Sequence, residues 1–275
     1  MANEETLVKS RSLRERWMRL RNFQSNDFWA MVFARPLTIL FLLPVADMAW
    51  VTPNLITWSS VVAKLAGLGV LVWLPDYWGG VGGALLVNLG LVLDNMDGTL
   101  ARYRGNSSYL GYYLDKTVDI ICLAGLFVAI ALRVYWVTAD LLDLLLPLTA
   151  FAGASVAAYC KWIYSRVETD IQLIEHRQAG TLEEFARSRA EQNPFIPPPE
   201  RTFAEWIRFV GRAFWSIIYF NEVDIFFFLL LAMVLNQAWL FTQVMAGVYT
   251  LGLLVGPVHF YFKLRGRIGR LSQGA

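Results

Sequence analysis

The sequence predicts an all-α, polytopic membrane protein with six transmembrane helices preceded by an interfacial amphipathic helix. Of the 275 residues, 56% are hydrophobic and only 17% are charged, which leaves too little polar surface for a water-soluble chain of this length. Apolar stretches close to the roughly 20 residues that a bilayer core requires recur along the chain. We therefore expect a single membrane-embedded domain over residues 1–275.

The apolar stretches place the expected helices in order. Residues 27–46 come first, but Arg35-Pro36 and Pro44 interrupt them. Proline removes a backbone donor and bends a helix, so we expect this segment to lie along the membrane interface rather than to cross it. A six-helix bundle should occupy residues 53–262. Its spans are expected near 53–74, 80–101, 109–133, 139–163, 222–236 and 238–262.

Residues 165–220, between the fourth and fifth expected spans, are rich in charge and should form a cytoplasmic excursion. The excursion contains the proline-rich run 195–199. From residue 201 onward, basic and aromatic residues alternate at helical spacing, which is typical of an interfacial amphipathic helix. We therefore expect the excursion to end in such a helix before the fifth span begins.

The distribution of basic residues predicts the orientation of the chain. Cytoplasmic segments of membrane proteins carry an excess of lysine and arginine. Here these residues cluster at 9–35, 102–104, 161–212 and 263–270. Both termini and the excursion should therefore face the cytoplasm, with the segments near 75–79, 134–138 and 237 on the other side. The N-terminus lacks the apolar core of a signal peptide, and the net charge of +2 gives no reason to expect a nucleic-acid partner.

Four aspartates lie within the apolar spans or at their ends, where a carboxylate without a partner costs about 2.5–3.5 kcal/mol. Asp94 and Asp97 share one face of the second expected span, and Asp115 and Asp119 share one face of the third, because residues three or four apart are neighbours on a helix. A short polar link joins the two spans and should make them antiparallel neighbours. Both pairs can therefore converge on one point.

Four converging carboxylates would repel one another strongly unless cations lay among them. Mg²⁺ and Mn²⁺ prefer carboxylate oxygen and bind substrate phosphates directly. We expect two such ions, an arrangement that stabilises the entering and leaving oxygens of a displacement at phosphorus. The alternative is a set of unrelated caps and ion pairs with Lys116, Arg102 and Arg104 as counter-ions, but two face-aligned pairs on adjoining apolar helices argue against it.

The residues around the aspartates form a long motif. Asp94-Asn-Met-Asp97-Gly98-Thr-Leu-Ala101-Arg102 is followed, after eight residues, by Gly111-Tyr-Tyr-Leu-Asp115-Lys-Thr-Val-Asp119. This pattern resembles the complete signature of the CDP-alcohol phosphatidyltransferase family, DxxDGxxAR followed by GxxxDxxxD, with every defining position filled. The segment Thr52-Pro53-Asn54-Leu-Ile-Thr57 at the start of the first span also resembles members of this family.

The resemblance implies a role for each motif residue. Asp94, Asp97 and Asp115 are expected to bind metal, and Asp119 is expected to act as the general base and also to contact metal. The small residues would let the nucleotide approach the backbone, and Arg102 would offer a planar fork to phosphate. The expected contacts to the CDP moiety are Asn54, Thr57, Gly98, Ala101, Arg102, Ser108 and Gly111.

Lys64 is the one further residue that we assign to the site. It lies eleven residues into the first expected span, about 16 Å deep at 1.5 Å per residue. A lysine at this depth should face the bundle interior and find an anion. Its partner is either an aspartate of the site or a phosphate of the substrate.

The activity implied by the resemblance belongs to phospholipid biosynthesis. The donor would be CDP-diacylglycerol or another CDP-alcohol, and the acceptor a small alcohol of the inositol phosphate, glycerol phosphate, serine or choline type, with release of CMP. Transfer of a CDP-linked head group to a lipid alcohol is the alternative within the family. The resemblance also implies a homodimer in contact with membrane lipid, multi-pass in the inner or cell membrane of a prokaryote, with a cytoplasmic active site.

Two other classes of protein fit parts of the pattern. An intramembrane prenyltransferase also binds a diphosphate through metals, but its two acidic motifs generally lie far apart, whereas 17 residues separate Asp97 from Asp115 here. A divalent-cation transporter could use four carboxylates in a selectivity site. It would explain neither the small residues nor the arginine of the motif.

Overall fold

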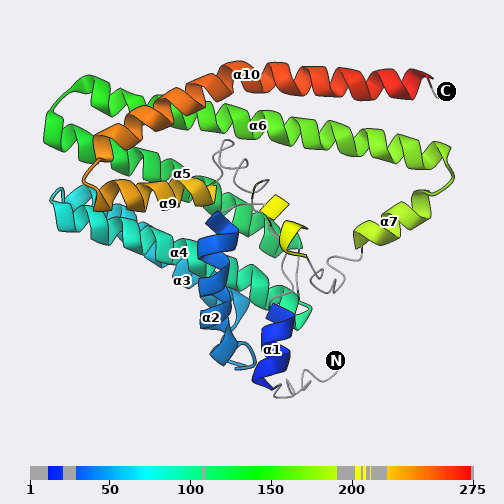
Figure 1. Ribbon diagram of the computed structural model, residues 1–275, viewed down its shortest axis with the longest axis horizontal. Coiled ribbons are helices and arrows are strands. Elements are labelled where there is room, and N and C mark those ends of the chain that lie inside the picture. Colours follow the sequence, from blue (N-terminus) through cyan, green and yellow to red (C-terminus); the bar gives the residue numbers. More distant parts are fainter. Residues whose placement is uncertain are drawn as a thin grey trace. The chain divides into compact units, whose positions relative to one another are not determined.

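The computed structural model describes residues 12–20, 29–106, 109–190, 202–205, 207–208, 211 and 222–273. These residues form helices and the short links between them, with no β-strand in the described part of the chain, so the all-α prediction is confirmed. The elements, labelled in Figure 1, are α1 (Leu13–Leu20), the π-helical turn η1 (Ala30–Ala34), α2 (Arg35–Val45), α3 (Pro53–Trp73), α4 (Tyr77–Arg104), α5 (Tyr109–Thr138), α6 (Leu141–Gln178), α7 (Leu182–Ala190), α9 (Glu222–Val234) and α10 (Ala238–Gln273).

Among the described residues, five helices are long and apolar enough to cross a membrane, namely α3, α4, α5, α6 and α10. They coincide with five of the six expected spans. The remaining one, 222–236, corresponds to α9, which has 13 residues and is therefore about 20 Å long, against roughly 30 Å for a bilayer core. The sixth crossing and the interfacial position of residues 27–46 stay predictions.

The chain forms two compact units. The first comprises Met1–Leu126 and Phe195–Asn236, and the second comprises Phe127–Pro194 and Gln237–Ala275. The boundary falls inside α5, and all the predicted site residues belong to the first unit.

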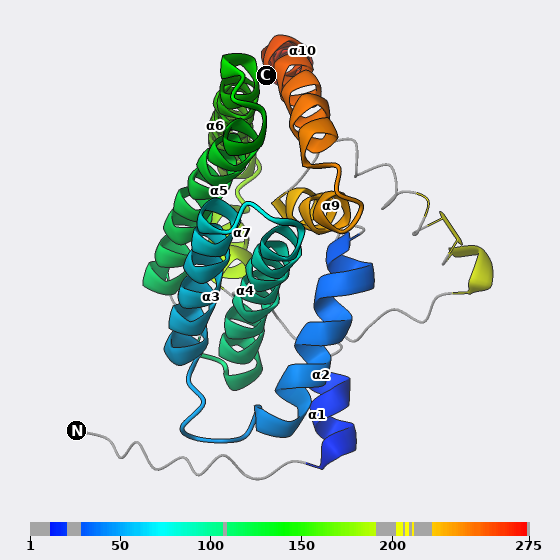
Figure 2. The same cartoon turned by 90° about the vertical axis from the view of Figure 1, so that its left-hand side faces the viewer.

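In the first unit, α3 and α4 run antiparallel and side by side (Figure 2). Two glycines allow their backbones to approach. A Cβ on Gly67 would lie 2.7 Å from the carbonyl oxygen of Gly83, and a Cβ on Gly83 would lie 2.9 Å from the carbonyl oxygen of Gly67. Small residues at such a crossing are what close helix packing within a membrane requires. The crossing brings the first half of α3 alongside the second half of α4, where the motif lies.

In the second unit, α6 and α10 pair along their length (Figure 1). Trp239 donates to Asp143 near the start of the pair at 3.1 Å, and Arg267 donates to Glu168 towards its end at 3.0 Å. The partners are 96 and 99 positions apart in sequence. Because this separation barely changes along the pair, the two helices run parallel.

The helix that contains the fourth expected span extends beyond the apolar stretch, and the position of the excursion stays a prediction. We expect the span to end near 163, and α6 continues as a helix to Gln178. No glycine or proline interrupts the chain between Gly153 and Gly180. Gly180 has a φ of 72°, and this left-handed conformation, which glycine adopts without strain, ends the helix. The predicted interfacial helix after residue 201 lies largely outside the described residues.

Candidate active site

The start of α3 places Thr57 against α4. Thr52 caps the helix by accepting a hydrogen bond from the Leu55 amide at 3.2 Å, and Pro53 occupies the first turn, an arrangement that both residue types favour. One turn further, the Thr57 hydroxyl hydrogen-bonds to the Asp97 carboxylate. The Gly98 amide donates to the same side chain. Asp97 is therefore oriented from two sides.

The end of α4 is fixed by Gly105. This residue has a φ of 70° and a ψ of 24°, a left-handed conformation that glycine adopts without strain. The Asn106 amide then donates to the Ala101 carbonyl at 3.0 Å. Because α5 begins only four residues later, at Tyr109, Asp115 lies at the level of Asp94 and Asp97.

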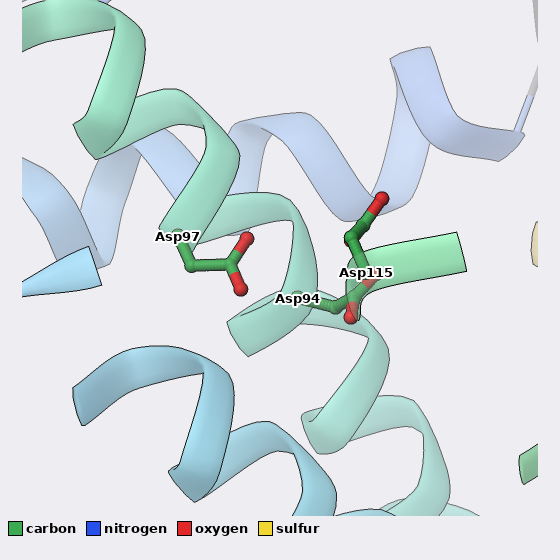
Figure 3. A group of neighbouring side chains, drawn as sticks. All are labelled: Asp94, Asp97 and Asp115. Atoms are coloured by element: carbon green, nitrogen blue, oxygen red, sulfur yellow. The ribbon is translucent and has the colours of Figure 1, made fainter. Parts of the chain in front are cut away.

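The carboxylates of Asp94, Asp97 and Asp115 converge, the first two from α4 and the third from α5 (Figure 3). One oxygen from each lies within 4.8 Å of the other two. Asp97 is buried, whereas Asp94 and Asp115 are half-buried. Three carboxylates gathered from two helices are a donor set that fits a hard divalent cation such as Mg²⁺ or Mn²⁺.

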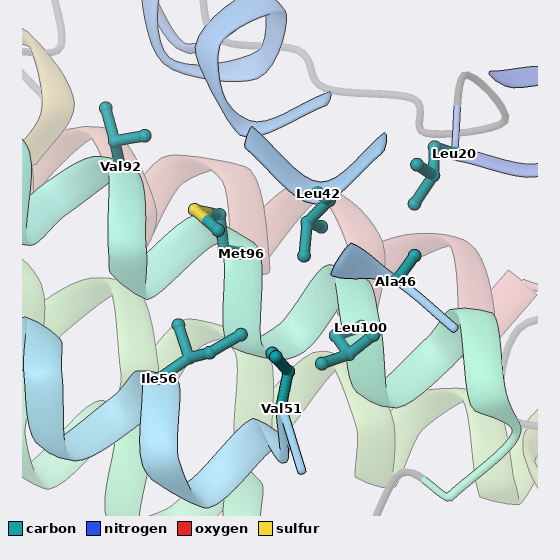
Figure 4. Packing of buried hydrophobic residues seen from close by; sticks show 8 residues of the cluster. All are labelled: Leu20, Leu42, Ala46, Val51, Ile56, Val92, Met96 and Leu100. Carbon is teal, nitrogen blue, oxygen red and sulfur yellow. The ribbon is translucent and has the colours of Figure 1, made fainter. Parts of the chain in front are cut away.

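The opposite side of α4 is held by apolar packing. Val92 and Met96 lie across the helix from Asp94, because two residues correspond to about 200° of rotation. They belong to a buried cluster contributed by α1, α2, α3, α4 and the link before α3 (Figure 4). Its members are Leu20, Leu42, Ala46, Val51, Ile56, Val92, Met96 and Leu100. This packing fixes the rotation of α4, so that its acidic side faces α3 and α5.

Two lysines connect Asp119 to the three converging aspartates. Lys64 Nζ lies 3.2 Å from Asp94 Oδ1 and 3.3 Å from Asp119 Oδ1. Lys116 Nζ lies 2.9 Å from Asp115 Oδ2 and 2.7 Å from Asp119 Oδ2. Of the two partners that the sequence left open for Lys64, the structure thus shows the aspartates. Lys116 entered the sequence argument only as a possible counter-ion.

Lys64 reaches the aspartates because α4 carries glycine at position 90. A Cβ on Gly90 would lie 2.5 Å from Lys64 Cγ and 3.0 Å from the carbonyl oxygen of Ser60. The Ser60 hydroxyl also donates to the Gly90 carbonyl at 2.8 Å. Sequence reasoning missed both Gly90 and Ser60, because they lie outside the motif and their importance arises only where two helices cross.

The residues predicted to contact CDP are placed less uniformly. A Cβ on Gly98 would lie 3.3 Å from both terminal nitrogens of the Arg102 guanidinium, so this cationic group covers the glycine next to Asp97. Ala101 is half-buried, while Asn54 and Gly111 are exposed. Ser108 lies outside the described residues. Thr57 contacts a predicted metal ligand, and its contact with CDP stays a prediction.

A comparison with protein-family models identifies the class of protein to which this site belongs. Residues 50–170 match the model for CDP-alcohol phosphatidyltransferase, and this range includes the whole motif. The segment that carries the motif therefore matches the family that the motif resembles. The matched family is a family of transferases.

Two curated proteins resemble parts of the chain. Phosphatidylinositol phosphate synthase from Cutibacterium acnes is 37% identical over 92 residues, which are 32% of this chain and 43% of that protein. Archaetidylinositol phosphate synthase from Aeropyrum pernix is 44% identical over 69 residues, which are 25% of this chain and 34% of that protein. The chain therefore matches less than half the length of each relative.

Among solved structures, phosphatidylinositol phosphate synthase from Mycobacterium tuberculosis with CDP-DAG bound matches with a TM-score of 0.44 at 19% sequence identity. That match covers 83% of this chain and 94% of the other.

Proposed function

We propose that this protein is a metal-dependent membrane transferase that moves a phosphatidyl group from CDP-diacylglycerol to a small alcohol and releases CMP. The observation that carries the proposal is the convergence of Asp94, Asp97 and Asp115 within a segment that matches the CDP-alcohol phosphatidyltransferase family. A diphosphate needs a site of this kind, because its charge is best neutralised by cations that carboxylates hold in place.

In this proposal, Asp94, Asp97 and Asp115 hold Mg²⁺ or Mn²⁺, and two ions would complete the site with Asp119. Bound there, the ions would neutralise the diphosphate and stabilise the charge that develops on the leaving CMP. Arg102, whose guanidinium covers Gly98, would donate hydrogen bonds to a phosphate of the donor. The small side chains at 98, 101 and 111 would leave room for the cytidine nucleotide.

The reaction would then be a direct displacement. The acceptor hydroxyl oxygen forms a bond to the phosphorus that carries the lipid, and the bond from that phosphorus to the bridging oxygen breaks, so that CMP leaves. Asp119 accepts the hydroxyl proton. Its carboxylate contacts Lys64 and Lys116, and the enclosed Lys64 would help to fix its direction towards the acceptor.

The acceptor that we propose to test first is an inositol phosphate. Both curated relatives are named as synthases of inositol phosphate lipids. Glycerol phosphate, serine and choline are the comparison acceptors. Transfer of a CDP-linked head group to a lipid alcohol remains the alternative donor arrangement, and product analysis distinguishes the two.

We also propose that the chain crosses the membrane six times, with both termini and the active site on the cytoplasmic side, and that it works as a homodimer in a prokaryotic cell membrane. The four basic clusters in the sequence support this orientation, and the five apolar helices of the described residues would supply five of the six crossings. The sixth crossing would use α9 together with neighbouring residues.

The test is product analysis with the purified full-length protein. The protein in lipid nanodiscs is incubated with CDP-diacylglycerol, Mg²⁺ or Mn²⁺ and each candidate alcohol, and CMP and the lipid product are identified. CMP release that requires an alcohol, stops with a chelator and is lost in Asp97→Asn supports the proposal. Pyrophosphate release from a prenyl diphosphate, or metal flux into sealed vesicles without a CDP substrate, would instead identify one of the two alternative classes.

A further inference from the structure

The two lysines of the site differ sharply in their access to solvent. The side chain of Lys64 is 1% exposed, whereas that of Lys116 is 56% exposed. Lys64 packs directly against Gly90, so closely that a Cβ on Gly90 would lie 2.5 Å from Lys64 Cγ. Lys116 lies on α5 with more than half of its side chain open. The site therefore contains one enclosed ammonium group and one accessible ammonium group.

Lys116 contacts a carboxylate that also belongs to the three-aspartate cluster. Its Nζ atom is 2.9 Å from Asp115 Oδ2, and Asp115 supplies one of the three converging oxygens. An ammonium group and a divalent cation on the same carboxylate repel each other, and each reduces the attraction available to the other. A lysine head group on a flexible four-carbon stem can move away into water when its stem is exposed. Lys64 has no comparable route.

We propose that Lys116 is a displaceable counter-ion, which competes with a divalent cation for Asp115 and leaves that carboxylate when the cation binds. Lys64 is the permanent counter-ion, which holds Asp94 and Asp119 together whether or not a cation is bound. This inference rests on the proposed function, because it requires that the aspartate cluster bind metal. Lys116 is thus a positioning residue, which sets the metal concentration at which the site becomes competent.

The first experiment is a calorimetric titration of Mg²⁺ and Mn²⁺ into full-length protein that has been treated with a chelator and then freed of it. Lys116→Met should bind the cation about 1.4- to fivefold more tightly than the wild type, since a largely exposed pair contributes about 0.2–1 kcal/mol and tenfold corresponds to about 1.4 kcal/mol. Lys116→Arg keeps the charge and should restore the wild-type affinity. Lys161→Met is the matched control, an exposed lysine on α6, and should leave the affinity unchanged.

The outcomes separate this inference from the proposed function. If the wild type binds no metal, or if Asp97→Asn binds metal as well as the wild type does, the proposed metal site is wrong and both proposals fail. If that binding is present but Lys116→Met binds metal no more tightly than the wild type, only the competition by Lys116 is refuted.

A second measurement uses the wild-type protein and does not depend on the folding of a variant. The acylation rates of Lys116 and Lys161 by an amine-reactive reagent are followed by mass spectrometry, with and without saturating Mg²⁺. Release of Lys116 from Asp115 should raise its rate while the rate of Lys161 stays constant. A rate at Lys116 that does not rise with bound metal would overturn the proposal.

Discussion

Asp119 differs from the other three aspartates in what its carboxylate contacts. Lys64 lies 3.3 Å from one of its oxygens and Lys116 lies 2.7 Å from the other, whereas oxygens of Asp94, Asp97 and Asp115 gather within 4.8 Å of one another. The three residues share surroundings that suit a cation, and Asp119 is oriented from both sides by ammonium groups. This contrast supports different roles in the proposed reaction.

Replacement of each aspartate by asparagine should separate these roles. Asn at 94, 97 or 115 removes a charged ligand, so metal binding and binding of CDP-diacylglycerol should weaken together. Asp119→Asn should retain much of the donor affinity, while the chemical rate falls by about 10²–10⁴, the usual contribution of a general base. Binding titrations and single-turnover rates on all four variants measure both quantities. Near-normal turnover in Asp119→Asn would refute its assignment as the base.

Lys64 should matter for stability as much as for activity. Lys64→Met leaves Asp94 and Asp119 without their enclosed partner. Removing one member of a buried ion pair lowers the free energy of unfolding by about 3–5 kcal/mol. We expect a lower midpoint of thermal unfolding in detergent and a loss of CMP release. Lys161→Met, at an exposed position, serves as the control. Equal and negligible effects of the two substitutions would show that the contacts of Lys64 contribute neither to stability nor to activity.

At the scale of the helices, the site depends on how closely α3 and α4 approach. The two helices meet at Gly67 and Gly83, and again where Gly90 lies beneath Lys64. The contacts of Ser60 with Gly90 and of Thr57 with Asp97 follow from the same crossing. A change in the distance between these helices should therefore disturb the site without altering any predicted ligand.

Gly90→Ala tests this dependence on helix spacing. The added methyl carbon would lie 2.5 Å from Lys64 Cγ and 3.0 Å from the Ser60 carbonyl, so the helices must shift, at a cost of about 1–3 kcal/mol. We expect a lower unfolding midpoint and weaker metal binding. Gly82→Ala is the matched control on the same helix, because nothing lies within 4 Å of its added carbon. That change should be neutral or stabilising by about 0.4–1 kcal/mol, and equal behaviour of the two variants would exclude the steric explanation.

The sequence predicted the parts of the site that local periodicity determines. Asp94 and Asp97 fall on one face of a helix through their spacing alone, and a short link brings Asp115 back beside them. Neither Gly90 nor Lys116 could be assigned in this way. The role of Gly90 depends on which neighbouring helix crosses it, and the role of Lys116 depends on the direction in which a long, flexible side chain turns.

Helix lengths were predicted less well than helix positions. The sequence indicated an end to the fourth span near 163, because charged residues follow it, yet α6 continues to Gln178. Arg267 on α10 lies 2.9 Å from Glu168 and 3.1 Å from Glu175, so the charged part of α6 has a partner helix there. Hydropathy marks where a helix can leave the bilayer and gives no information on where it ends.

At the scale of the whole molecule, the polar and apolar segments alternate in a way that constrains how the chain crosses a membrane. In the part of the chain that the structure describes, five helices satisfy the length and composition of a span, while α9, with 13 residues, is short for one. If α9 and its neighbours do not cross, the excursion and the segment at 237 must lie on the same side. If they do cross, these two segments lie on opposite sides.

Single cysteines introduced into a protein whose native Cys122 and Cys160 have been replaced by serine can decide between these arrangements. In the six-span arrangement, cysteines at Ser10, Gln192 and Ser272 should resist a membrane-impermeant thiol reagent in intact cells and react after lysis, because the basic clusters hold these segments in the cytoplasm. A cysteine at Gln237 should react before lysis, because an odd number of crossings would separate it from Gln192. Protection at both 192 and 237 would mean that α9 does not cross. Ser272 should then react before lysis, since α10 would carry the C-terminus to the outside, and the cytoplasmic placement of the C-terminus would be wrong.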